Sequence, residues 1–278
     1  MTGQHTAGEG AKQERIRGVF STQEVKRVGT GTTTRKTIQK AFWYVDQNDA
    51  GGIEVQPLNN NYIPSGPKRA ITMEELIEKF APEPEFYVQT VYPKMRELNQ
   101  TVARGDRHRQ RGEHFSAEFE YGNALKVDED NVRANFGLGL TYLSRGDTDK
   151  ADDIFGRLVK LDAAFEEEHK HLFNDFGINL RKSKMLEQAV TYYSRALELS
   201  SSDENLHLNI ARALLEKQDY PTCAEHVLQA LSLNPTHDAG LKFLVWLQQK
   251  NLMPEALLPR VAEALRRAKE SAAQQAPA

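Results

Sequence analysis

A block of 34 residues occurs three times in the second half of the chain, and this repeat constrains the fold more than any other feature. The copies cover residues 132–165, 170–203 and 204–237. Each copy has a large apolar residue followed by a small one, in the pairs Leu138-Gly139, Phe176-Gly177 and Ile210-Ala211. Self-similarity at such a period indicates stacked supersecondary units that bury a continuous core only together.

The second half of each copy indicates a second helix that packs on the first. A small residue and, four positions later, a bulkier one recur in the pairs Ala151-Phe155, Ala189-Tyr193 and Cys223-Val227. A small residue lets two helices approach closely, and the bulky residues fill the space beside it. The turns between the helices are predicted at Ser144–Asp147 and Glu216–Tyr220.

These residues resemble the tetratricopeptide repeat, whose pattern has apolar, small and aromatic positions in the same order. The resemblance implies a mostly α fold, a tetratricopeptide-repeat α-solenoid over residues 98–269. A degenerate copy covers 98–131, where Arg104 and His108 occupy apolar positions; 238–250 is a further first helix, and 254–269 a capping helix. The insert Glu166–His169 is consistent with an added helical turn or a longer loop.

The segment 19–67 has a different, two-residue period. In Lys36–Gln47 the side chains of Ile38, Phe42 and Tyr44 alternate with those of Ala41, Trp43 and Val45. This alternation predicts a strand with apolar groups on both faces. Further strands are predicted at Ile53–Leu58 and Gly18–Val28, and 59–69 is an irregular linker, giving a small β-hairpin or meander. Such a sheet would pack on the helical part or pair with a second chain.

The remaining segments are a helical connector and two tails. Residues 68–97 are predicted as the connector, with Thr72 as N-cap, Glu75 completing a capping box, and Pro82 and Pro84 ending the first helix. Residues 1–18 and 270–278 offer little to bury, so we expect disordered tails there.

Composition narrows the class of protein. The net charge is −3, the chain has one cysteine, and its first thirty residues lack an apolar signal region. A single cysteine excludes an internal disulfide and suits a reducing compartment. Apolar stretches such as Leu241–Leu247 are too short to span a bilayer. We therefore expect a cytoplasmic, bacterial protein that does not contact membranes.

No residue pattern supports catalysis, a cofactor or a metal site. The stretch VGTGTTTRKT (Val28–Thr37) suggests a phosphate loop, but Arg35 stands where that loop needs glycine, and the sequence continues as a strand. His169 and His171 are two residues apart beside the acidic insert, so on a helix they would diverge. Cys223 occupies a small packing position. We predict a protein that is not an enzyme.

The resemblance implies a concave groove lined by the first helix of each pair. The residues that would face it are Arg133, Phe136, Leu140, Leu143, His171, Asn174, Ile178, Arg181, Asn205, Leu208, Arg212 and Leu215. Apolar positions with arginines suit a peptide that carries some acidic groups. The lysine and asparagine positions with which family members grip chaperone tails are Phe136 and Leu140 here, so that partner is not expected.

The leading hypothesis is a non-catalytic adaptor or scaffold that binds a protein or peptide partner in this groove. A homo-oligomer formed through the N-terminal strands is compatible with it. One alternative is a chaperone for secretion or assembly clients. Another is a regulatory protein that contacts nucleic acid through a basic arm. This arm, residues 12–40, has eight basic residues against Glu14 and Glu24. The overall charge argues against nucleic acid.

Overall fold

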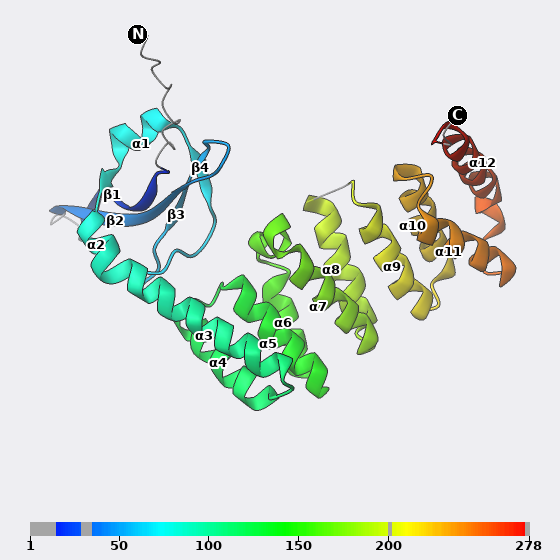
Figure 1. Ribbon diagram of the computed structural model, residues 1–278, viewed down its shortest axis with the longest axis horizontal. Helices are drawn as coiled ribbons and strands as arrows, with labels where there is room; N and C mark the ends of the chain where they lie inside the picture. The colour runs from blue at the N-terminus through cyan, green and yellow to red at the C-terminus, as the bar shows by residue number, and fades with distance from the viewer. Residues whose placement is uncertain (1–14, 29–34, 200–201, 276–278) are drawn as a thin grey trace, which may run out of the picture. The chain divides into compact units, whose positions relative to one another are not determined.

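The computed structural model describes residues 15–28, 35–199 and 202–275, which divide into two units (Figure 1). The first unit comprises Met1–Thr101 and Lys126–Asp130, and the second Val102–Leu125 and Asn131–Ala278. Residues 1–14 and 276–278 of the predicted disordered tails lie outside the described residues. The described parts of those tails are ordered, because β1 begins at Arg17 and the last helix continues to Gln275.

The first unit contains an antiparallel sheet in the order β4-β3-β2-β1-β5. The strands are β1 (Arg17–Val28), β2 (Arg35–Gln47), β3 (Ile53–Pro57), β4 (Arg69–Ile71) and β5 (Ala81–Pro82). The first three match the predicted strands. The last two lie in the segment predicted as a helical connector, so that prediction is wrong there. Strands of two and three residues are too short to show a period in the sequence.

Both faces of this sheet are covered by helices that follow it in the chain. Trp43 and Val45 pack with Leu76 and Phe80 at α1 (Met73–Lys79). On the other face Tyr44 and Phe42 pack with Val91, Tyr87 and Met95. The covering elements are α2 (Pro84–Phe86), the π-helix Tyr87–Val91 and the start of α3 (Tyr92–Gln110). The predicted alternation of apolar groups is thus satisfied within the unit, and each fully buried side chain contributes about 1.5–3 kcal/mol.

Two local features fix the helices of this unit. The Thr72 hydroxyl accepts a hydrogen bond from the Glu75 N–H at 3.1 Å, which confirms the predicted N-cap of α1. The Glu75 carboxylate instead accepts a hydrogen bond from Arg69 at 3.0 Å. In the loop after β3, Ser65 donates a hydrogen bond to Asp128 at 2.7 Å, which ties residues 126–130 to this unit.

The second unit is a series of helix pairs, which Figure 1 shows as successive antiparallel hairpins. After α3 the helices are α4 (His114–Val127), α5 (Val132–Arg145), α6 (Thr148–Leu158), α7 (Lys170–Lys182), α8 (Leu186–Leu199), α9 (Glu204–Glu216), α10 (Tyr220–Leu233), α11 (Asp238–Gln249) and α12 (Leu258–Gln275). This is the predicted helical-repeat solenoid. No helix in the described ranges is long and apolar enough to cross a membrane.

The small residues of the repeat lie where one helix contacts the next. A Cβ atom added to Gly177 of α7 would lie 2.4 Å from Cζ of Tyr193 on α8. In the degenerate first copy, ion pairs replace apolar contacts, since Arg104 lies 2.9 Å from the Glu120 carboxylate. The insert after the first clear copy forms a 3₁₀ turn, Glu167–His169, so it is a longer connection and does not extend α6.

Candidate partner-binding groove

Four of the residues predicted to line the groove are buried in the solenoid core, so their assignment to its surface is wrong. Phe136, Leu140, Leu143 and Leu208 are at most 6% exposed. The reason is that α5 is enclosed on nearly all sides, from Ala134 to Leu143. The ring of Phe136 packs edge-on against Phe176 of α7, with 5.8 Å between centroids.

The other eight predicted residues keep some exposure. His171, Asn205, Arg133 and Arg212 are exposed, and Asn174, Ile178, Arg181 and Leu215 are half-buried. Arg133 is already paired with Asp106, at 2.5 Å. The surface offered by α5, α7 and α9 is therefore more polar than the sequence predicts.

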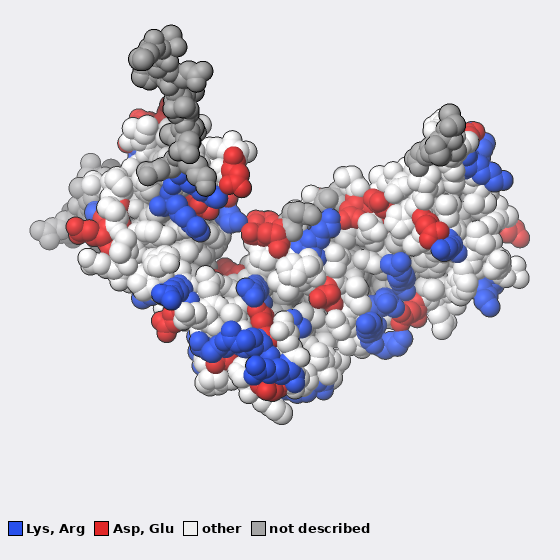
Figure 2. Space-filling view, in the orientation of Figure 1, with Lys and Arg blue, Asp and Glu red and all other residues white. Residues whose placement is uncertain are grey.

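Positive charge is concentrated where α7 and α9 meet. Arg181 forms an ion pair with Glu216, and Lys184 contacts the same carboxylate at 2.7 Å. These two cations lower the pKa of Glu216, so it remains ionised. Figure 2 shows basic side chains, with acidic ones among them, over the part of the repeat unit where Figure 1 places α7–α9. Lys184 and Glu216 were missed at the sequence level because they stand at helix ends, outside the repeated positions.

Arg212 is the unbalanced charge in this cluster. The side chain as a whole is exposed, but desolvation of its guanidinium and the neighbouring Arg181 both lower its pKa. Its guanidinium donates a hydrogen bond to Asn209 at 2.8 Å. Among the described residues, no carboxylate lies within ion-pair distance of Arg212. A guanidinium in this setting favours an incoming anion.

Tyr193 of α8 lies close to both arginines, which act on its phenol electrostatically. Its buried ring packs against Gly177 of α7. Its pKa is raised well above the usual range by that burial, so the phenol stays protonated. The site therefore offers two guanidinium groups at its surface, over a buried Tyr193 ring that stays uncharged. These groups can bind an anionic side chain or a chain-terminal carboxylate, and none of them is an activated nucleophile.

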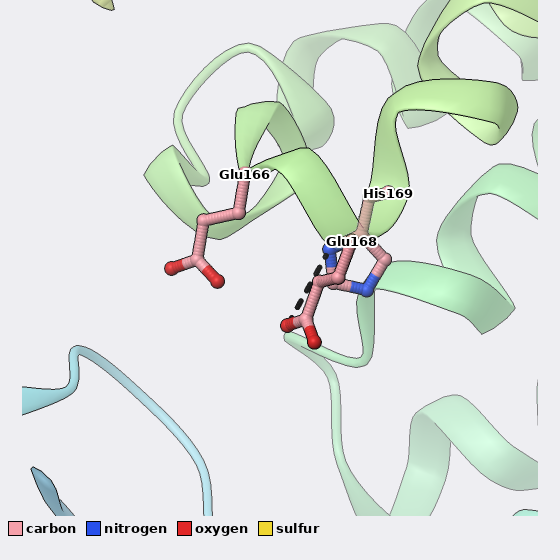
Figure 3. Close-up of side chains that lie close together, drawn as sticks. All are labelled: Glu166, Glu168 and His169. Atoms are coloured by element: carbon pink, nitrogen blue, oxygen red, sulfur yellow. Dashed lines mark ion pairs between the residues drawn. The ribbon is translucent and has the colours of Figure 1, made fainter. Parts of the chain in front are cut away.

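The acidic insert gathers three possible metal ligands, Glu166, Glu168 and His169, with ligand atoms within 4.8 Å of one another (Figure 3). The His169 Nδ1 atom lies 3.0 Å from the Ala163 carbonyl oxygen. That contact requires a proton on Nδ1, which leaves Nε2 as the ring's ligand atom. Both glutamates are exposed, and three such donors do not fill the coordination shell that zinc takes in a structural site. His171 does not join this group.

The other candidates from the sequence fall into structural roles or outside the described residues. Residues 29–34 of the glycine- and threonine-rich stretch are not described, and Arg35, Lys36 and Thr37 belong to β2, as predicted. Of the basic arm, Lys40 pairs with Glu83 at 2.6 Å and Arg15 with Asp46 at 3.4 Å. Cys223 is fully buried, and that burial raises the pKa of its thiol to about 12.

Comparisons with known proteins identify the repeat. The family model described as tetratricopeptide repeat matches residues 132–165, the first of the three clear copies. The match agrees with the helix-pair solenoid of the structure and with the 34-residue period that three copies share in the sequence. This chain contains tetratricopeptide repeats.

The curated relatives of this repeat protein are larger. It is 28% identical to a peroxisomal targeting signal receptor of Eremothecium gossypii over 56% of this chain and 26% of that protein. It is 23% identical to anaphase-promoting complex subunit 3 of Schizosaccharomyces pombe over 51% of this chain and 20% of that protein. The chain thus spans about a quarter or less of the length of these relatives.

Solved structures are also similar. The MamA protein is 20% identical, with a TM-score of 0.44, and the match covers 65% of this chain and 97% of that one. YrrB, titled a TPR protein with an unusual peptide-binding site, is 18% identical, with a TM-score of 0.40, over 63% and 90% of the two chains. Tetratricopeptide-repeat proteins in general use such arrays as extended surfaces for protein interaction.

Proposed function

We propose that this tetratricopeptide-repeat protein is a non-catalytic adaptor that holds an acidic segment of a protein partner against α7 and α9. The observation that carries the proposal is Arg212, a partly desolvated guanidinium beside Arg181 with no carboxylate partner in the described chain. A carboxylate from the partner would supply the missing counter-charge. It would also remove the repulsion that now lowers the pKa of Arg212.

Glu216 leaves part of the positive charge of this cluster unneutralised. It neutralises one of the three cations, Arg181, Lys184 and Arg212, so a net positive charge remains for the ligand. The half-buried Ile178 and Leu215 lie on the same two helices and supply apolar contact. An acidic segment with at least one apolar side chain therefore fits the surface better than a purely polar one.

The test is affinity purification of tagged chain from its native host, followed by identification of the proteins that bind. The variant Arg181→Glu/Arg212→Glu should lose its partners, while Arg157→Glu/Arg260→Glu should retain them. The control residues are exposed arginines on α6 and α12, outside the proposed site. If both double variants retain the same partners as wild type, the groove assignment is wrong.

An affinity measurement on one purified partner would then isolate Arg212. Removing one charge-assisted contact costs about 1.5–3 kcal/mol, so Arg212→Gln should weaken binding about ten- to a hundredfold. The effect should shrink as salt is added, because part of the attraction is screened. An unchanged affinity would remove Arg212 from the site.

A further inference from the structure

Helix α11 continues the surface that α7 and α9 form, and it starts in the same register. Asp203 caps the start of α9, and His237, one repeat later, caps the start of α11. The His237 Nδ1 atom accepts a hydrogen bond from the Gly240 N–H at 3.2 Å, so the ring proton is on Nε2. That Nε2 lies 3.2 Å from Asn205 Oδ1 and joins the start of α11 to the start of α9.

Trp246 occupies on α11 the position that Arg212 occupies on α9. Each is the ninth residue of its helix. The third, seventh and tenth residues of both helices are buried, so the two helices turn the same side toward the core. Trp246 and Arg212 therefore lie on equivalent faces of neighbouring repeated helices, and Trp246 stands outside the groove residues predicted from the sequence.

Trp246 forms an aromatic pair with Phe243 on this face. The ring centroids are 6.3 Å apart, Trp246 is 37% exposed and Phe243 is half-buried. The equivalent pair on α9 is Arg212 with Asn209, whose side chains share a hydrogen bond. The face thus changes from a positively charged pair on α9 to an apolar pair on α11. Exposed tryptophan is the residue type most enriched at the energetic centres of protein interfaces.

The charge of this face selects an acidic occupant. Among the residues that the structure describes, Arg212 and the exposed Lys250, one turn beyond Trp246, have no carboxylate within ion-pair distance. The carboxylate of Asp238 on α11 is paired with Lys242 at 2.6 Å. A second copy of this chain, placed symmetrically on this face, would bring the same two cations and be repelled. An acidic segment is attracted.

We propose that the acidic segment bound at Arg212 continues onto α11, where it places one large apolar side chain on the rings of Phe243 and Trp246. Helices in contact have axes about 8–10 Å apart, and an extended chain advances about 3.3 Å per residue. The acidic residue at Arg212 and the apolar residue at Trp246 are therefore about three positions apart in the segment. This inference rests on the proposed function, because both use Arg212.

The test uses a phage-displayed library of random peptides of about ten residues, long enough to cross α7, α9 and α11, selected on the full chain. We expect the selected peptides to share an acidic and an apolar residue at this spacing. One selected peptide is labelled, and its affinity is measured by fluorescence anisotropy. Trp246→Ala should weaken binding about tenfold, and Trp246→Phe, which keeps a ring, about threefold at most. Val245→Ala is the control, because Val245 is similarly exposed, at 39%, but lies about 100° around the helix.

A second measurement detects the contact itself. In the Trp43→Phe chain, Trp246 is the sole tryptophan. An unlabelled selected peptide that lacks tryptophan should protect the fluorescence of Trp246 from quenching by acrylamide, because the bound apolar side chain covers the indole. Unchanged quenching at a saturating peptide concentration would overturn the contact.

Arg212→Gln separates this inference from the proposed function. If Arg212→Gln weakens the peptide and Trp246→Ala does not, the site on α7 and α9 stands and its extension onto α11 is wrong. If neither variant weakens the peptide, or if no peptide is selected, both are wrong. Weakening by Trp246→Ala alone also overturns the inference, because the segment is then not anchored at Arg212. A dimer of the free chain that Trp246→Ala abolishes would assign the ring pair to self-association instead.

Discussion

At the scale of single residues, glycines set how closely the repeat helices pack. Gly177→Ala places a methyl group 2.4 Å from Tyr193 Cζ, and the buried Tyr193 ring cannot move aside freely. We expect a loss of about 1–3 kcal/mol in the free energy of unfolding, measured by urea denaturation. Gly122→Ala is the matched control, because nothing lies within 4 Å of its added methyl group. That control should gain up to about 1 kcal/mol from helix propensity.

A pair of histidines inside the third clear repeat gives stability a dependence on pH. The Nδ1 atoms of His207 and His226 lie 3.0 Å apart, so one ring must donate and the other accept. Burial lowers the pKa of His207, and burial together with His207 lowers that of His226, each from 6.5. The nearby Asp203 and Glu225 carboxylates oppose these shifts without reversing them.

The sign of the pH effect follows from those directions. Between the lowered pKa values and 6.5 the unfolded chain binds more protons than the folded one, so stability falls as the pH drops through this window. We expect the urea midpoint of wild type to decrease as the pH is lowered from about 7.5 to about 5.5. The urea midpoint of His226→Gln should decrease less over the same range. Equal pH slopes for the two proteins would contradict this role of the pair.

At the scale of elements, the N-cap of α1 stabilises the helix that covers one face of the sheet. Thr72→Ala removes the hydroxyl that accepts from the Glu75 N–H. The expected cost is about 1 kcal/mol in the stability of the N-terminal unit, followed by the fluorescence of Trp43, which packs against Phe80 just after α1. Thr72→Ser should restore most of it. A result in which alanine and serine behave alike would show that the cap contributes nothing.

The elements also show what the sequence could and could not reveal. The repeat helices were predictable because the aligned copies place Gly139 and Gly177 at equivalent positions of the repeat. The burial of α5 was not predictable, because the periodicity marks Phe136 and Leu140 as helical without showing whether they face the core or the surface. β4 and β5 were missed because these short strands are defined only by their pairing with residues distant in the sequence. Ile71 pairs with Ile53 of β3, and Ala81 pairs with Ser21 of β1. The charge of Arg212 and its neighbours depends on which side chains meet between α7 and α9, information that lies in the packing alone.

At the scale of the whole molecule, the division into two units predicts separate unfolding. The chain has two tryptophans, and each reports on one unit: Trp43 on the first and Trp246, in α11, on the second. Chains of more than one unit commonly depart from a single cooperative transition. We therefore expect the single-tryptophan variants Trp246→Phe and Trp43→Phe to give different urea midpoints by fluorescence.

Two substitutions make this prediction specific. Thr72→Ala should lower only the midpoint reported by Trp43, because α1 belongs to the first unit. Gly177→Ala should lower only the midpoint reported by Trp246, because α7 and α8 belong to the second. If either substitution shifts both midpoints by the same amount, the units unfold together. If the midpoints move separately, a partner bound to α7 and α9 raises only the Trp246 midpoint, so binding to the repeat unit has its own spectroscopic readout.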